Sequence, residues 1–86
     1  MIELLKVKTT SNPNAVAGAI ANILKSQKKL KVQAIGAGSI NQTVKALAIA
    51  RGLLVLSGND LVCMPFCSVK FFHQKFVHVY VFHILN

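Results

Sequence analysis

Residues 33–52 read Gln-Ala-Ile-Gly-Ala-Gly-Ser-Ile-Asn-Gln-Thr-Val-Lys-Ala-Leu-Ala-Ile-Ala-Arg-Gly, and this stretch decides the fold. The pattern predicts the end of a strand, then a glycine-rich turn, then an α-helix over about residues 40–51. Gly36 and Gly38 leave the backbone of the turn free to adopt positive φ or to approach another group closely. Ser39 is the predicted N-cap, because its hydroxyl can accept hydrogen bonds from the N–H groups of the first turn.

The predicted helix has one apolar face. Its apolar residues recur at the spacing i, i+4, i+7 and i+8, which predicts a core-facing stripe of Ile40, Val44, Leu47 and Ala48. In helical projection, three residues lie away from this stripe: Gln42, Lys45 and Ile49. An isoleucine in that position indicates a second contact surface. Gly52 stands where a C′ residue would close the helix.

Further strands and one more helix are predicted on both sides of this stretch. Asn12 can cap a helix that Pro13 begins, because proline suits the first helical position. The third strand continues past Pro65 only if it lies at an edge of the sheet. The predicted elements are strands at 2–7, 30–35 and 61–64, a helix at 13–27, and one or two strands within 69–85, joined near residues 73–75. This β-α-β-α-β-β order predicts a single α+β domain over residues 1–86, built as a two-layer sandwich.

The composition is that of one small domain with an excess of apolar residues. The chain has 86 residues, of which 53% are apolar, enough for one core but not for a deep substrate cavity. The apolar excess favours burial against another subunit, so we expect a homodimer or a tetramer. Residues 76–85 are too few to span a membrane and include His78 and His83. Residues 1–8 lack the apolar region of a signal peptide, so a cytoplasmic protein is expected.

The charge is strongly positive. Ten Lys and Arg residues stand against two acids, Glu3 and Asp60, which gives a formal net charge of +8. This balance favours anionic partners, nucleic acid first and an anionic membrane second. Of these two we expect nucleic acid and no membrane. A basic protein without such a partner is the alternative.

Six segments within residues 2–65 carry a further signal: Ser11–Ala19, Gln33–Gly38, Asn41–Gln42, Val44–Ala46, Ala48–Gly52 and Asp60–Leu61. Together they closely resemble the stage V sporulation protein S family. The resemblance implies a small bacterial cytoplasmic protein that acts in sporulation, at septation and in later spore and coat maturation. It also implies a fold similar to that of Alba, a dimeric chromatin and RNA-binding protein with the same β-α-β-α-β-β order.

The chain departs from this pattern in two places. Alba-type proteins place basic residues in the glycine loop, where this chain has Ala37 and Ser39. Residues 66–86 lack the acidic, polar hairpin that the resemblance implies, and they are rich in Phe, Val and His. This divergent strand segment is either a frameshifted end that stays β-prone or the product of ordinary divergence.

The glycine turn and the helix after it form the candidate site. Free N–H groups and the helix dipole converge at the turn and could hold a phosphate, although a tight turn also requires glycine. Polar residues on the first helical turns could contact a phosphodiester backbone; a solvated face or contacts across a dimer are the alternatives. The residues expected to bind nucleic acid or an anion are Gly36, Gly38, Ser39, Asn41, Gln42, Lys45, Lys31 and Lys8. Arg51 is expected in solvent, or in a buried or intersubunit hydrogen bond.

Neither metal binding nor catalysis is expected. Cys63 and Cys67 flank Pro65 at a spacing that suits zinc poorly, so we expect free thiols in a reducing compartment. The two acids lie far apart, and no Ser, Cys or His is arranged as a nucleophile with a base. We therefore expect no enzyme and no cofactor.

The leading interpretation is a non-catalytic sporulation regulator that binds nucleic acid through phosphate contacts of the second helix and its glycine loop. The alternative is a protein–protein adaptor in sporulation or septation, with a sporulation or division protein as its partner. Ile49 and the small residues of the first helix favour this adaptor. A third hypothesis is a small anionic ligand at residues 36–39. Phosphate contacts weaken steeply with salt, whereas an apolar interface changes little.

Overall fold

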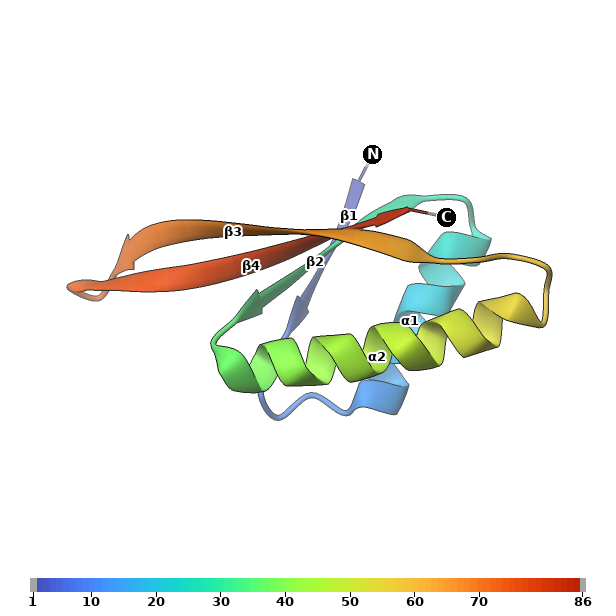
Figure 1. The fold of residues 1–86 in the computed structure, drawn as a ribbon, viewed down its shortest axis with the longest axis horizontal. Coiled ribbons are helices and arrows are strands. Elements are labelled where there is room, and N and C mark those ends of the chain that lie inside the picture. Colours follow the sequence, from blue (N-terminus) through green and yellow to red (C-terminus); the bar gives the residue numbers. More distant parts are fainter. Residues whose placement is uncertain (1, 86) are drawn as a thin grey trace.

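The computed structural model describes residues 2–85, apart from the side chain of Phe72. The elements are β1 (Ile2–Val7), α1 (Pro13–Lys25), β2 (Lys29–Ile35), α2 (Ala37–Val55), β3 (Val62–Phe72) and β4 (Lys75–Leu85) (Figure 1). The strands form one sheet in the order β1-β2-β4-β3, in which only β1 and β2 are parallel. The predicted α+β architecture with β-α-β-α-β-β order is confirmed, and it is consistent with an Alba-like fold.

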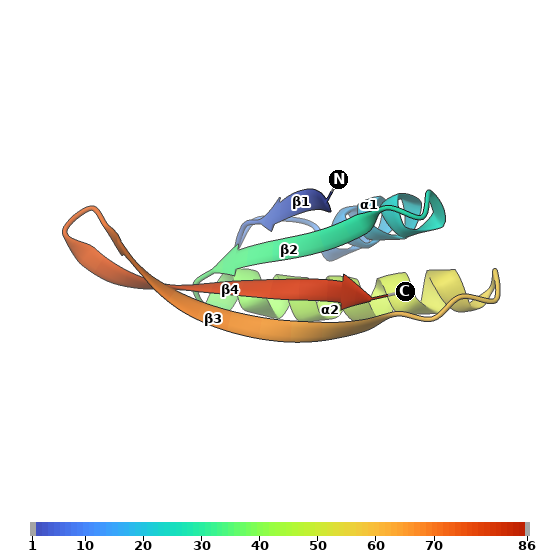
Figure 2. The same cartoon turned by 90° about the horizontal axis from the view of Figure 1, so that it is seen from above.

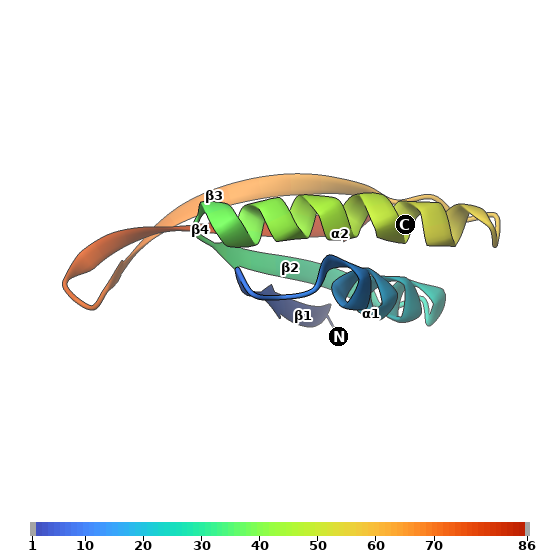
Figure 3. The same ribbon diagram turned by 90° about the horizontal axis from the view of Figure 1, so that it is seen from below.

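Both helices lie on the same face of the sheet. Figure 2 shows the strands in front of the two helices, and Figure 3 shows the helices in front of the strands. The core fills the space between these layers, and its largest fully buried apolar side chains are Ile20, Leu24, Leu30, Val32 and Leu54. No helix of residues 2–85 is long and apolar enough to cross a membrane.

Helix α1 begins where its local signals predict. The Oδ1 atom of Asn12 accepts a hydrogen bond from the backbone N–H of Asn14 at 2.8 Å, and Pro13 is the first helical residue. The helix ends at Lys25 and not at Gln27, because Gln27 has φ of 60° and so leaves the helical region.

The predicted limits of helix α2 were wrong at both ends. Its N-cap is Gly36, whose φ of 87° and ψ of 159° turn the chain out of β2. Ser39 is therefore already inside the helix, and its hydroxyl donates backwards to the carbonyls of Ile35 and Gly36. Gly52 is also helical, because burial of Leu54 continues the helix for another turn, to Val55.

The face of α2 that meets the core also differs from the predicted stripe. Val44 and Ala48 of that stripe are exposed, and the buried positions are Ser39, Thr43, Ala46, Leu47, Ala50 and Leu54. Hydroxyl groups are tolerated there because they bond to their own helix: the Thr43 Oγ1 atom donates to the Ser39 carbonyl at 2.8 Å. Ile49 packs partly against the core, so it does not mark a second contact surface.

Strand β3 is an edge strand, which satisfies the condition for its passage through Pro65. It continues far beyond Met64 and joins β4 through a two-residue turn at His73 and Gln74, whose φ values are 47° and 60°. Strand β2 pairs with β4 only over Val79–Ile84. Residues 69–78 therefore extend past β2 as a hairpin arm, which gives the molecule its long dimension of 45 Å (Figure 1).

Candidate nucleic-acid interface

The turn after β1 is held against the start of α2. The Gln42 Nε2 atom donates to the carbonyl of Ser11 at 2.8 Å. A Cβ atom on Gly38 would lie 2.7 Å from the Cγ2 atom of Thr9, so this close approach requires glycine. Two elements that are distant in sequence, the β1–α1 turn with Lys8 and the N-terminal turn of α2, are thus brought together.

The first turn of α2 has no side chain that caps it. Ser39 is 1% exposed and its hydroxyl donates to carbonyls of the turn, so only the backbone of the turn offers N–H donors. Asn41 and Lys45 are exposed one helical turn apart, so their side chains share a face. Gln42 is half-buried and bonded to the β1–α1 turn. The geometry therefore separates solvent-facing candidates, Asn41 and Lys45, from residues that shape the turn, Ser39 and Gln42.

A surface depression of about 340 Å³ lies at the carboxyl ends of the parallel strands β1 and β2. Its lining includes Lys6, Lys8, Gln33 and Ile35. Ligands of α/β sheets commonly bind outside the carboxyl ends of parallel strands, where helix N-termini also point. The depression brings Lys8 together with Lys6.

Lys31 does not lie on the helical side of the molecule. It alternates along β2 with the core residues Leu30 and Val32, so its side chain is on the face of the sheet that carries no helix. We call this surface the open face; its residues include Ile2, Leu4, Lys6, Lys29, Lys31, Gln33, Ile35, Val62, Met64, Phe66, Lys70, Val81, His83 and Leu85. The structure thus divides the predicted site residues between the two faces.

The sequence reasoning missed an aromatic pair on the open face. The rings of Phe66 and His83 meet edge to face, with centroids 4.7 Å apart. Strand alternation was the available signal, since Met64 and Phe66 share one face of a strand and Val81 and His83 share one face of the next.

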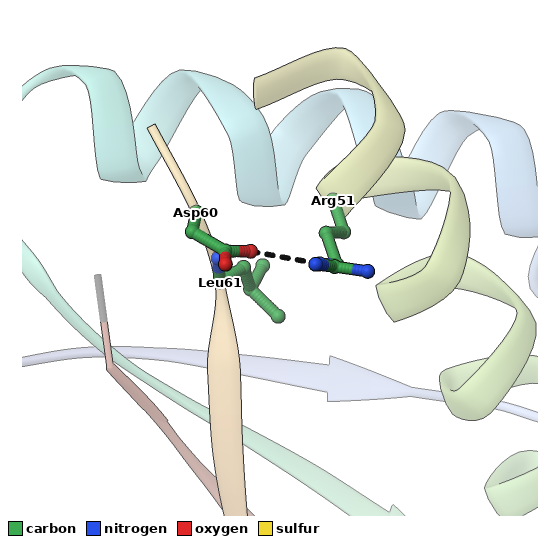
Figure 4. Close-up of polar contacts among 3 residues, drawn as sticks. All are labelled: Arg51, Asp60 and Leu61. Atoms are coloured by element: carbon green, nitrogen blue, oxygen red, sulfur yellow. Dashed lines mark hydrogen bonds and ion pairs between the residues drawn. The ribbon is translucent and has the colours of Figure 1, made fainter. Parts of the chain in front are cut away.

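Both acidic residues are engaged by basic ones. The Lys28 Nζ atom lies 3.6 Å from a carboxylate oxygen of Glu3. The Arg51 Nε atom donates to the Asp60 Oδ1 atom at 2.7 Å, from the end of α2 to the loop before β3 (Figure 4). This hydrogen bond, together with one from the backbone N–H of Leu61, lowers the pKa of Asp60. Arg51 is exposed, as one of the two expectations had it, but its pairing with Asp60 of the same chain was not predicted.

The cysteines and histidines do not assemble into a metal-binding cluster within residues 2–85. Cys63 and Cys67 are exposed free thiols, and the Cys67 Sγ atom lies 3.6 Å from the His78 Nδ1 atom across the hairpin. This pair supplies two potential ligands, fewer than a structural zinc site requires.

Comparison with known families agrees with the resemblance in the sequence. The family model of stage V sporulation protein S matches residues 3–79. The match covers both helices, the first three strands and the turn of the hairpin arm, and it extends into the segment 66–86. A sporulation-related role follows from this membership. The chain belongs to the stage V sporulation protein S family.

Proposed function

We propose that this protein is a non-catalytic regulator of sporulation that binds nucleic acid, mainly through phosphate contacts. We further propose that it acts in the cytoplasm as a homo-oligomer. The distribution of charge carries the nucleic-acid proposal. Lys28 and Arg51 compensate the two acids, and the remaining lysines have no carboxylate partner among residues 2–85. A polyanion can satisfy such unpaired lysines and release its counterions on binding.

The phosphate contacts are proposed at the start of α2. Lys8 and Lys45 supply positive charge, Asn41 supplies an amide donor, and the turn offers backbone N–H groups that no side chain caps. Gly36 allows a backbone to approach this turn, since a Cβ atom there would meet no heavy atom within 4 Å, whereas at Gly38 that space is taken by the side chain of Thr9. Binding of this kind contacts phosphates and sugars, so we expect it to tolerate many base sequences.

Fluorescence anisotropy of labelled duplex DNA and single-stranded RNA tests this proposal. Lys45→Ala and Lys8→Ala should each weaken binding and each lower the slope of log K against log salt by about 0.9 on duplex DNA. Lys25→Ala, at the exposed end of α1, is the matched control and should change little. Equal effects of Lys25→Ala and Lys45→Ala would remove α2 as the binding site.

A second candidate function, a protein–protein adaptor, is favoured by the hairpin arm. Phe71 and Phe76 pair at the arm with centroids 5.1 Å apart, yet they are 64% and 74% exposed. An apolar surface that extends past the rest of the fold suits a protein partner or a second copy of the chain. Phe76→Ser should then dissociate an oligomer or abolish partner capture, as measured by sedimentation velocity. An unchanged sedimentation profile together with unchanged partner capture would exclude the arm.

A further inference from the structure

The open face carries an exposed stacking surface on its β3–β4 side. Phe66 is 51% exposed although it contacts His83 edge to face, and Met64 beside it is half exposed. Met64 lies directly across from His83, and Phe66 lies directly across from Val81, so these side chains form one continuous patch over β3 and β4. Neither helix covers this patch, since both helices pack on the other side of the sheet (Figure 2).

Positive charge lies beside this patch on the same face. Lys31 lies directly across from His83, and Gln33 lies directly across from Val81. Lys6 of β1 lies directly across from Gln33. Lys29 lies two residues before Lys31 in β2 and therefore on the same face. A depression of about 620 Å³, where β2 begins and β4 ends, is lined partly by Lys29, Lys31 and His83.

No carboxylate of residues 2–85 neutralises this face. Glu3 alternates with Leu4 along β1 and is paired with Lys28, while Asp60 precedes β3 and is paired with Arg51. The face therefore combines exposed rings with uncompensated lysines. A second copy of the chain in face-to-face contact would oppose lysines to lysines, which charge complementarity disfavours.

We propose that the open face binds single-stranded nucleic acid, with Phe66 and His83 stacking on bases and Lys6, Lys29 and Lys31 contacting phosphates. The inference rests on the proposed nucleic-acid function and deepens it by naming the strand state. Proteins that bind single strands combine a basic surface along the backbone with aromatic side chains that stack on bases. A duplex keeps its base faces stacked inside, so the rings would contribute nothing to duplex binding.

The test is an anisotropy titration with labelled oligo-dT and oligo-rU of about 12 nucleotides, which fits known site sizes. A duplex of equal length is titrated in parallel. Phe66→Ala should raise the Kd for the single strands by about 5- to 150-fold, the effect of losing one base stack, and leave the duplex Kd unchanged. Phe66→Leu keeps apolar surface without a ring and should weaken single-strand binding in the same direction. Lys31→Ala should lower the single-strand salt slope by about 0.7.

Two control variants leave the open face intact. Cys63→Ala removes an exposed side chain from the opposite face of β3, and Lys25→Ala removes a lysine from the helical layer. Circular dichroism establishes that each variant is folded, and sedimentation velocity records its mass. Single-strand Kd values that are equal for wild type, Phe66→Ala and Phe66→Leu overturn the inference, as does a fall in mass caused by Phe66→Ala.

The two proposals fail in different ways. If Lys45→Ala weakens binding and Phe66→Ala does not, only the proposal for the open face is contradicted. If the folded wild type binds no oligonucleotide, the nucleic-acid function is contradicted, and the proposal for the open face falls with it. Oligo-dU titrated beside oligo-rU separates DNA from RNA, because these two differ only in the 2′-hydroxyl, whereas oligo-dT also carries a 5-methyl group.

Discussion

Gly36→Ala should destabilise this protein through backbone strain alone. Gly36 combines φ of 87° with ψ of 159°, a conformation almost confined to glycine. A Cβ atom at this position would meet no heavy atom within 4 Å, so no steric clash adds to the strain. Residues in such regions cost about 1–3 kcal/mol, and each kcal/mol lowers the Tm of a domain this size by about 4–8 °C.

Urea unfolding followed by circular dichroism measures this cost directly. Gly52→Ala is the matched control, because Gly52 lies inside α2 with open space around its missing Cβ. Alanine there should stabilise the fold by about 0.8–1 kcal/mol, so the two glycine-to-alanine substitutions should change the free energy of unfolding in opposite directions. D-Alanine at position 36, introduced by chemical synthesis, should restore stability, because positive φ is ordinary for that enantiomer. A Gly36→Ala protein as stable as wild type would refute the strained turn.

Three further predictions follow from the packing and the polar contacts. Leu54→Ala should lower the free energy of unfolding by about 2–5 kcal/mol, because Leu54 is fully buried. Leu56→Ala, at an 87% exposed position, should change it by no more than about 0.5 kcal/mol. Equal free energies of unfolding for the two variants would place the end of α2 elsewhere. Arg51→Ala should raise the pKa of Asp60 in an NMR titration. Because folding lowers that pKa, the ion pair contributes its full stability above the ordinary value of 3.8, and this contribution is lost as pH falls from there through the lower pKa of the folded state. An unshifted titration would contradict the pair. Gln42→Ala should cost about 1 kcal/mol through loss of its bond to the β1–α1 turn, and a neutral effect in chemical unfolding would show that the bond contributes nothing.

Much of the fold could be predicted because its signals are local. Asn12 and Pro13 carry their own capping chemistry, and that chemistry depends on no distant residue. Pro65 restricts β3 to an edge for an equally local reason, the missing N–H. Glycine at position 36 indicated a turn, and the turn is present with positive φ.

The errors arose where packing between layers outweighs local preference. Ser39 has the chemistry of an N-cap, but the turn at Gly36 moves the helix start and leaves the hydroxyl to donate within the helix. Thr43 is polar in sequence and yet fully buried, because its hydroxyl bonds to a carbonyl of its own helix. A pattern that sorts residues only into apolar and polar cannot show that a buried hydroxyl has a hydrogen-bond partner in its own helix.

The candidate site was predictable in part. The contact between Gly38 and Thr9 joins segments that only the tertiary structure brings together. Lys31 could have been separated from the helical site by strand alternation, since its neighbours in β2 are core residues. Phe66 and His83 meet only through the register of β3 and β4, which a turn without an Asn-Gly signal did not specify.

The most direct test of the central claim is the salt dependence of nucleic-acid binding by the wild-type protein. Anisotropy titrations of labelled duplex and single-stranded oligonucleotides at about 50 and 200 mM salt cover the range over which several phosphate contacts cost orders of magnitude in affinity. We expect measurable binding at the lower concentration and a steep loss at the higher one, with a slope of log K against log salt that counts the phosphate contacts. A folded protein that binds no oligonucleotide at about 50 mM salt, or one whose affinity is equal at both concentrations, would contradict it.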